Sequence, residues 1–210
     1  MKEKDIYNEI SSIKKMMERS TRFISLSGLS GVLSGIYAII GAALAYQLIE
    51  KSQGIIRFPA QYSELVIQIL LIGVTVLILS VATCIWLTSR NANRKGQSVW
   101  NESSKSLLKS SSLPLLTGGC LLLILLSQGY YGIIAPVCLI FYGLSLVAGS
   151  QFTYGDIKWL GICEIALGLL STLMPNLGLV FWTTGFGVLH IVYGILMHLK
   201  YDRENSIEKL

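Results

Sequence analysis

Residues 65–89 read LVIQILLIGVTVLILSVATCIWLTS, a run without a single charged side chain. A transmembrane α-helix needs about 20 consecutive apolar residues, so this run can cross a bilayer once. Charged side chains are also missing from residues 23–49 and 110–155. Between Lys158 and Lys200, Glu164 is the only Asp, Glu, Lys or Arg. The apolar stretches therefore predict a polytopic membrane protein.

The predicted architecture is an all-α bundle of six transmembrane helices, because the two longer stretches each hold a pair of helices divided at a turn. The turns are expected at Ser127–Tyr130 and at Met174–Asn176, where Gly129 and Pro175 break the helical pattern. The six spans are predicted at about 23–49, 64–88, 107–127, 131–150, 156–174 and 177–200. The transmembrane domain 23–200 then leaves only a segment 1–22 and a tail 201–210 outside the bilayer.

Charge places the two ends of the chain. Hydrophobic residues make up 52% of the sequence and charged residues 14%, against about 25% charged in soluble domains. If the chain starts in the cytoplasm and crosses six times, all of its 17 Lys and Arg except Lys51 and Arg57 fall on the cytoplasmic side. This is the positive-inside pattern, and it predicts that both termini are cytoplasmic. It also explains the net charge of +5, so the expected partner is the lipid bilayer and not nucleic acid.

Segment 1–22 is predicted to form an amphipathic helix. Ile6, Ile10, Ile13 and Met17 recur at spacings of three and four residues and share one face, with charged residues on the rest. Such a helix can lie on the inner leaflet, on a partner or on the protein's own loops. No cleavable signal peptide is expected, and the first span would serve as an uncleaved anchor.

Small residues recur at helical spacing inside four of the spans, and close backbone approach over small residues is how helices associate in lipid. The stripes use Ser27, Gly31 and Gly35; Ser145 and Gly149; Glu164 and Gly168; and Gly187, His190 and Gly194. The first stripe has two interpretations, packing within the bundle or a homo-oligomer interface. The motif alone does not distinguish them.

Glu164 is the one carboxylate deep inside a span, which makes it a functional candidate. Its expected partner is His190. The turn at Pro175 makes the fifth and sixth spans antiparallel, and the depths of the two residues differ by only about 4–5 Å at 1.5 Å per residue. This intramembrane pair could relay protons or respond to pH. Alternatively, it could hold the two helices together and have no other role.

Motifs for catalysis or for ion and cofactor binding are weak or missing in the sequence. Residues 183–187, TTGFG, match the pattern of a potassium-channel filter, but too few residues follow for a full inner helix, and Val188 stands where an Asp often follows. Sequence signatures of common enzymes are absent. The four cysteines lie in predicted spans without a C-x-x-C pair, and two histidines cannot form a multi-histidine metal site. No enzyme activity, cofactor or metal is expected.

Residues 161–168, GICEIALG, and 187–194, GVLHIVYG, place glycines within apolar helices in a style that resembles the HdeD-type family. The resemblance covers mainly residues 110–200. It implies a small six-span protein of the bacterial cytoplasmic (inner) membrane that is linked to acid stress. The amphipathic start and the charged segment 90–109 depart from the family's pattern.

Two functions remain open at this point. The first is a non-enzymatic membrane protein that acts through helix packing and cytoplasmic contacts, as a regulatory, stress-related or interaction component with a homo-oligomeric or cytoplasmic protein partner. The second is a small transporter or proton-coupled carrier that uses Glu164 and His190. A hydrated cavity around the pair would favour the carrier, and a dry helix contact would favour the first function.

Overall fold

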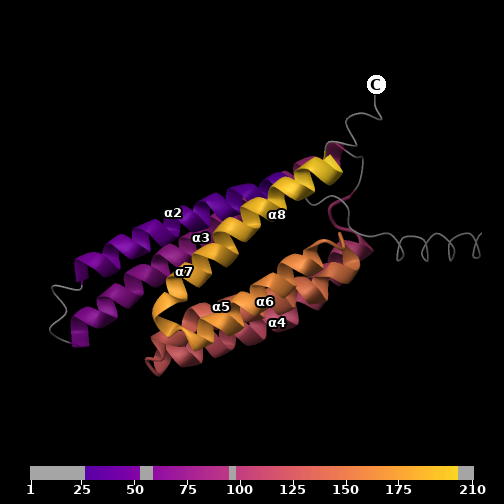
Figure 1. Ribbon diagram of the computed structural model, residues 1–210. Coiled ribbons are helices and arrows are strands. Elements are labelled where there is room, and N and C mark those ends of the chain that lie inside the picture. The colour runs from indigo at the N-terminus through magenta and orange to yellow at the C-terminus, as the bar shows by residue number, and fades with distance from the viewer. Residues whose placement is uncertain (1–26, 53–58, 95–97, 203–210) are drawn as a thin grey trace, which may run out of the picture.

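The computed structural model describes residues 27–52, 59–94 and 98–202, and these ranges are helical without any strand (Figure 1). The prediction of an all-α fold is confirmed for this part of the chain. The predicted amphipathic helix 1–22 and residues 203–210 of the tail lie outside the described residues. The helices are α2 (Gly28–Ser52), α3 (Pro59–Arg94), α4 (Glu102–Ser127), α5 (Ile134–Gly149), α6 (Ile157–Leu173), α7 (Gly178–Trp182) and α8 (His190–Met197).

After α6, residues 175–202 form one continuous helical rod, called here the C-terminal rod. A 3₁₀ turn at Pro175–Leu177 leads into α7, a π-helical segment η4 (Thr183–Leu189) connects α7 to α8, and a second π-helical segment (His198–Asp202) follows. The sixth span was expected as a plain helix from residue 177 to 200. The structure differs by inserting two wider π-helical turns, and the first of them lies beside Glu164.

Five helices in the described ranges are long and apolar enough to cross a membrane. They run over Gly28–Ser52, Glu64–Arg94, Glu102–Ser127, Tyr131–Phe152 and Pro175–Tyr201. The remaining helix, α6, has 17 residues and is about 26 Å long at 1.5 Å per residue. This lies at the short end of the range for a membrane span. Its bounds agree with the predicted span of about 156–174 to within one residue at each end.

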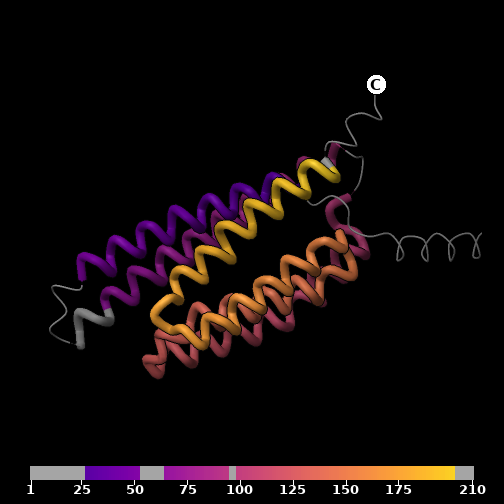
Figure 2. Tube along the Cα trace, in the orientation of Figure 1, coloured from indigo at the N-terminus to yellow at the C-terminus, as the bar shows by residue number. Residues whose placement is uncertain are grey.

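The helices form two groups of three (Figures 1 and 2). In one group α2 packs on α3 and α8, and in the other α5 packs on both α4 and α6. The C-terminal rod connects the groups, because α7 contacts α5 and α6 whereas α8 contacts α2. The rod therefore changes neighbours along its length, and η4 is where it passes from one group to the other.

The link between α3 and α4 is shorter than the sequence predicts. The second span was expected to end at residue 88 and the third to begin at 107, but α3 continues to Arg94 and α4 begins at Glu102. Asn101 caps α4 by accepting the backbone N–H of Ser104 at 2.8 Å, and Ser104 Oγ accepts the backbone N–H of Asn101 at 3.0 Å. This reciprocal cap fixes the helix start outside the apolar stretch. These helices extend beyond the ends of the apolar runs that predicted them.

Candidate functional site

Helices α5, α6 and α8 bring three polar side chains together inside the bundle: Tyr142, Glu164 and His190, called here the polar cluster. Nδ1 of His190 lies 3.4 Å from Oε1 of Glu164. The structure thus places side by side the two residues that the antiparallel hairpin suggested. Tyr142, from α5, is the third member, and its Oη lies 2.8 Å from Nε2 of His190.

The hydrogen bonds of His190 define the tautomer of its neutral ring. Nδ1 lies 3.0 Å from the carbonyl oxygen of Gly185. A carbonyl only accepts, so Nδ1 carries the proton and donates it. Nε2 of the neutral ring is then an acceptor, and Tyr142 donates its hydroxyl proton to it. The imidazole therefore links α5 to the C-terminal rod with both of its nitrogens engaged.

Glu164 is enclosed by protein. Its exposed fraction is 0%, and that of His190 is 7%. Neither Oε1 nor Oε2 of Glu164 has a hydrogen-bond partner among the described residues. A carboxyl group without such partners is costly in an apolar interior. The sequence left open whether a hydrated cavity surrounds the pair, and in this conformation Glu164 has no surface exposed to solvent.

The π-helical segment makes room for the carboxyl group. A Cβ atom built on Gly185 would collide with Oε2 of Glu164 and would lie 2.5 Å from Cδ2 of Leu139. A methyl group at position 185 would therefore have to displace the side chains of Glu164 and Leu139. The ring of Phe186, the next residue, packs on Tyr142 with centroids 5.0 Å apart and on His190 at 5.9 Å. Insertions of π-helix inside α-helices often occur at functional sites, and this one shapes the polar cluster.

The filter-like sequence TTGFG has a different role from the one that its pattern suggested. Residues 183–187 are helical, so their carbonyls do not line an extended filter. Thr183 and Thr184 turn their hydroxyls to the carbonyls of Leu179 and Val180, at 2.7 and 2.9 Å. Gly185 of this motif instead lies against the carboxyl group of Glu164, and its carbonyl accepts a hydrogen bond from His190.

The stripe on the first span faces α8. A Cβ atom on Gly31 would lie 3.2 Å from Cα of Gly194, and one on Gly35 would lie 2.6 Å from the carbonyl oxygen of Gly187. Ser27 precedes α2, and its carbonyl accepts the Ser30 hydroxyl at 2.6 Å. The structure therefore uses Gly31 and Gly35 for packing within the bundle, which leaves that face of α2 covered.

The other stripes also pack within the bundle. A Cβ atom on Gly149 would lie 2.5 Å from Oγ of Ser111 in α4, and the carbonyl of Ser145 accepts that hydroxyl at 3.1 Å. A Cβ atom on Gly168 in α6 would lie 2.6 Å from Cγ1 of Ile140 in α5. These contacts join α4, α5 and α6 closely at backbone distance.

A second polar contact joins the two groups at one end of the bundle. Nζ of Lys200 and Oη of Tyr201 each donate to Oδ2 of Asp156 at 2.8 Å. The sequence does not predict this contact, because Asp156 and Lys200 are both charges at the ends of predicted spans and nothing in their spacing pairs them. A metal site is not apparent: the described residues contain no group of three or more His, Cys, Asp or Glu that could hold an ion.

We expect the Asp156 contact to make stability depend on acid pH. The hydrogen bond from Lys200, followed by that from Tyr201, holds the pKa of the Asp156 carboxyl below its ordinary value. The native pKa is the lower one, so the stabilisation is complete above about pH 4, the pKa of Asp in an unfolded chain. It is lost as pH falls through the native pKa.

Asp156→Asn should therefore lower the unfolding temperature slightly near pH 7. In acid, the variant and the wild type should have the same unfolding temperature. Thermal unfolding in detergent between about pH 3 and pH 7 measures this difference. The effect is small because the side chains of Lys200 and Asp156 are 57% and 40% exposed. Parallel pH profiles for the two proteins would contradict the prediction.

Comparison with protein-family models, with curated proteins and with solved structures finds no match to this chain.

Proposed function

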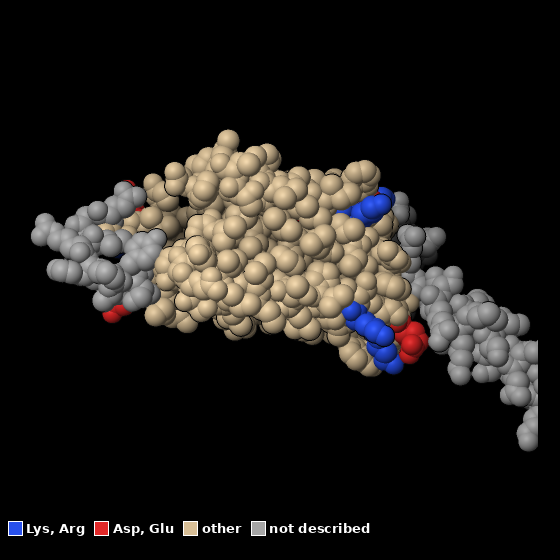
Figure 3. All heavy atoms as spheres, turned by 90° about the horizontal axis from the view of Figure 1, so that it is seen from below, with Lys and Arg blue, Asp and Glu red and all other residues tan. Residues whose placement is uncertain are grey.

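We propose that the chain is an integral protein of the bacterial inner membrane that crosses the bilayer six times, with both termini in the cytoplasm. Five helices of sufficient length and a sixth of 17 residues support this threading. Blue cationic side chains gather at one end of the face seen in Figure 3, next to a broad surface without charge. Apart from Lys51, the described cations lie where the helices meet that end: Arg90, Arg94, Lys105, Lys109, Lys158 and Lys200.

We further propose that the protein is not an enzyme and acts through helix packing and cytoplasmic contacts, as a regulatory, stress-related or interaction component. The observation that carries this proposal is the enclosure of Glu164, whose exposed fraction is 0%. A carboxyl group that water cannot reach in this conformation fits a structural contact between the two helix groups. The stress-related role additionally follows the resemblance to the HdeD-type family.

The test compares the wild type with Glu164→Gln after reconstitution in liposomes that contain a pH-sensitive dye. The structural role predicts no proton flux for either protein and a change in unfolding temperature for the variant. A proton flux that the wild type carries and the variant loses would contradict it. Purification from detergent should also retain a protein partner or an oligomer, and a chain that is repeatedly monomeric and alone would count against an interaction role.

A second candidate function, a small proton-coupled carrier, is favoured by one specific feature. Both oxygens of Glu164 lack a hydrogen-bond partner among the described residues, and Tyr142 and His190 form a continuous chain of polar atoms beside them. Such a chain could pass a proton if a second conformation admitted water to it. The flux lost in Glu164→Gln would establish this function, and an unchanged flux would exclude it.

A further inference from the structure

A row of exposed residues that winds slowly around α3 changes character along the helix. Ile78, Ala82, Trp86, Arg90 and Arg94 follow one another at four-residue spacing, and all five are exposed. Ile78 and Trp86 are each 61% exposed. Along this row the side chains change from aliphatic to aromatic to cationic. A membrane helix shows the same order as it passes from the acyl chains through the interface to the headgroups.

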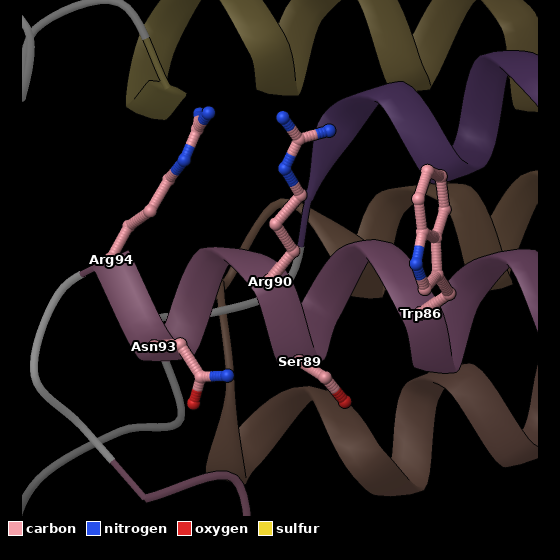
Figure 4. Close-up of a pocket in the computed structure, with 5 residues that line it drawn as sticks. All are labelled: Trp86, Ser89, Arg90, Asn93 and Arg94. Carbon is pink, nitrogen blue, oxygen red and sulfur yellow. The ribbon is translucent and has the colours of Figure 1, made fainter.

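Two arginines meet a tryptophan in a groove at the end of this row. Figure 4 shows Trp86, Arg90 and Arg94 projecting from the same side of α3. With Ser89 and Asn93 they line an open groove of about 460 Å³. The guanidinium carbon of Arg90 lies 5.9 Å from the centroid of the Trp86 ring, a position that stacks the charge over the aromatic face.

No ion pair joins either arginine to a carboxylate among the described side chains, residues 27–52, 64–94 and 98–201. Two other cations at this end have such a partner: Lys105 lies 3.1 Å from Glu102, and Lys200 lies 2.8 Å from Asp156. The guanidinium groups of Arg90 and Arg94 are exposed, and their planar forks suit phosphate oxygens in a bidentate arrangement.

The depth of the groove fits a phospholipid headgroup. At 1.5 Å per residue, Arg90 lies about 6 Å and Arg94 about 12 Å beyond Trp86 along α3. The polar region of each leaflet adds about 5–8 Å to the hydrocarbon core. With Trp86 at the edge of the core, Arg90 reaches the level of the lipid phosphates and Arg94 can bend back to them.

We propose that this groove binds the phosphate of an anionic phospholipid of the cytoplasmic leaflet, whose acyl chain lies along Ile78 and Ala82. The site uses the membrane threading proposed above but none of the polar cluster. A negative result in the Glu164 experiments would therefore not count against the lipid site. A failure of the lipid-binding test would likewise not count against the role proposed for the polar cluster.

The test uses the purified full chain in detergent, with bound lipid counted by native mass spectrometry. Phosphatidylglycerol, phosphatidylcholine and inorganic phosphate are titrated separately. The wild type should bind phosphatidylglycerol more tightly than phosphatidylcholine, and Arg90→Gln/Arg94→Gln should weaken phosphatidylglycerol binding about 10- to 30-fold, since each basic residue near an anionic membrane surface contributes favourably. Phosphatidylcholine binding should stay unchanged.

The matched control is Lys105→Gln/Lys109→Gln, which removes two cations at the same four-residue spacing from the start of α4. It should leave phosphatidylglycerol binding within about twofold of the wild type, because these residues do not line the groove. Equal weakening by both double variants would overturn the site in favour of diffuse attraction. Inorganic phosphate that competes fully with the lipid would overturn the phospholipid as ligand. Arg90→Lys/Arg94→Lys keeps the charge and should bind with intermediate affinity; wild-type affinity would overturn bidentate recognition.

Discussion

Gly194→Ala should destabilise the bundle by about 1–3 kcal/mol, the usual cost of overpacking a close contact. A Cβ atom on Gly194 would lie 2.5 Å from the backbone nitrogen of Val32 and 2.7 Å from the carbonyl oxygen of Gly28. Both atoms belong to the backbone of α2, so no side-chain rotation can relieve the collision. Gly194→Leu should prevent α2 and α8 from packing at all.

The chain offers a matched control for this substitution. Gly73 also lies inside a membrane-length helix, but a Cβ atom built on it meets nothing within 4 Å. Gly73→Ala should therefore leave stability unchanged or raise it by up to about 1 kcal/mol through helix propensity. Thermal unfolding of both variants in one detergent measures the difference. Equal unfolding temperatures would show that α2 and α8 are not in backbone contact.

His190→Leu is expected to cost about 2–4 kcal/mol of unfolding free energy. The substitution removes the acceptor of the Tyr142 hydroxyl, the donor to the Gly185 carbonyl and the 3.4 Å contact with Glu164, and each buried polar group left without a partner costs about 1–3 kcal/mol. The imidazole, carried by α8, also joins the C-terminal rod to α5 through its contact with Tyr142. Its loss should therefore loosen the contact between the two helix groups.

A double-mutant cycle isolates the bond between Tyr142 and His190. Tyr142→Phe removes the hydroxyl and keeps the ring that packs on Phe186. The double variant should be about 1 kcal/mol more stable than the sum of the two single effects predicts, because the hydroxyl is no longer stranded. Strict additivity in thermal unfolding would mean that the 2.8 Å contact contributes nothing to the fold.

The sequence was sufficient to suggest the meeting of Glu164 and His190, because that inference needed only a hairpin at Pro175 and the rise of an α-helix. The other residues around this pair could not be predicted in this way. Tyr142 lies 48 residues from His190 in the chain and on a helix whose neighbours no local pattern defines. The π-helical segment at Gly185 lies against the carboxyl group of Glu164, and no local pattern in its sequence predicts that tertiary contact.

For the helix ends and the glycine stripes, too, the sequence predicted one part and the structure was needed for the rest. Apolar runs predicted where the helices cross lipid, but α3 and α4 continue into polar sequence. At α4, capping by Asn101 and Ser104 determines where the helix starts. The small residues of the first span predicted a close contact without identifying its partner. The partner is α8, which comes from the far end of the chain.

The central claim is that Glu164 lies in a dry contact inside a membrane-threaded bundle. Single-cysteine labelling in intact cells with a membrane-impermeant maleimide tests it most directly, with Cys84, Cys120, Cys138 and Cys163 replaced by alanine. Lys51→Cys should react from outside, Ser98→Cys only after the membrane is permeabilised, and Glu164→Cys in neither condition while the protein stays folded. Reaction of the folded Glu164→Cys protein would reveal a water-filled route to that position, and reaction of Ser98→Cys from outside would contradict the threading.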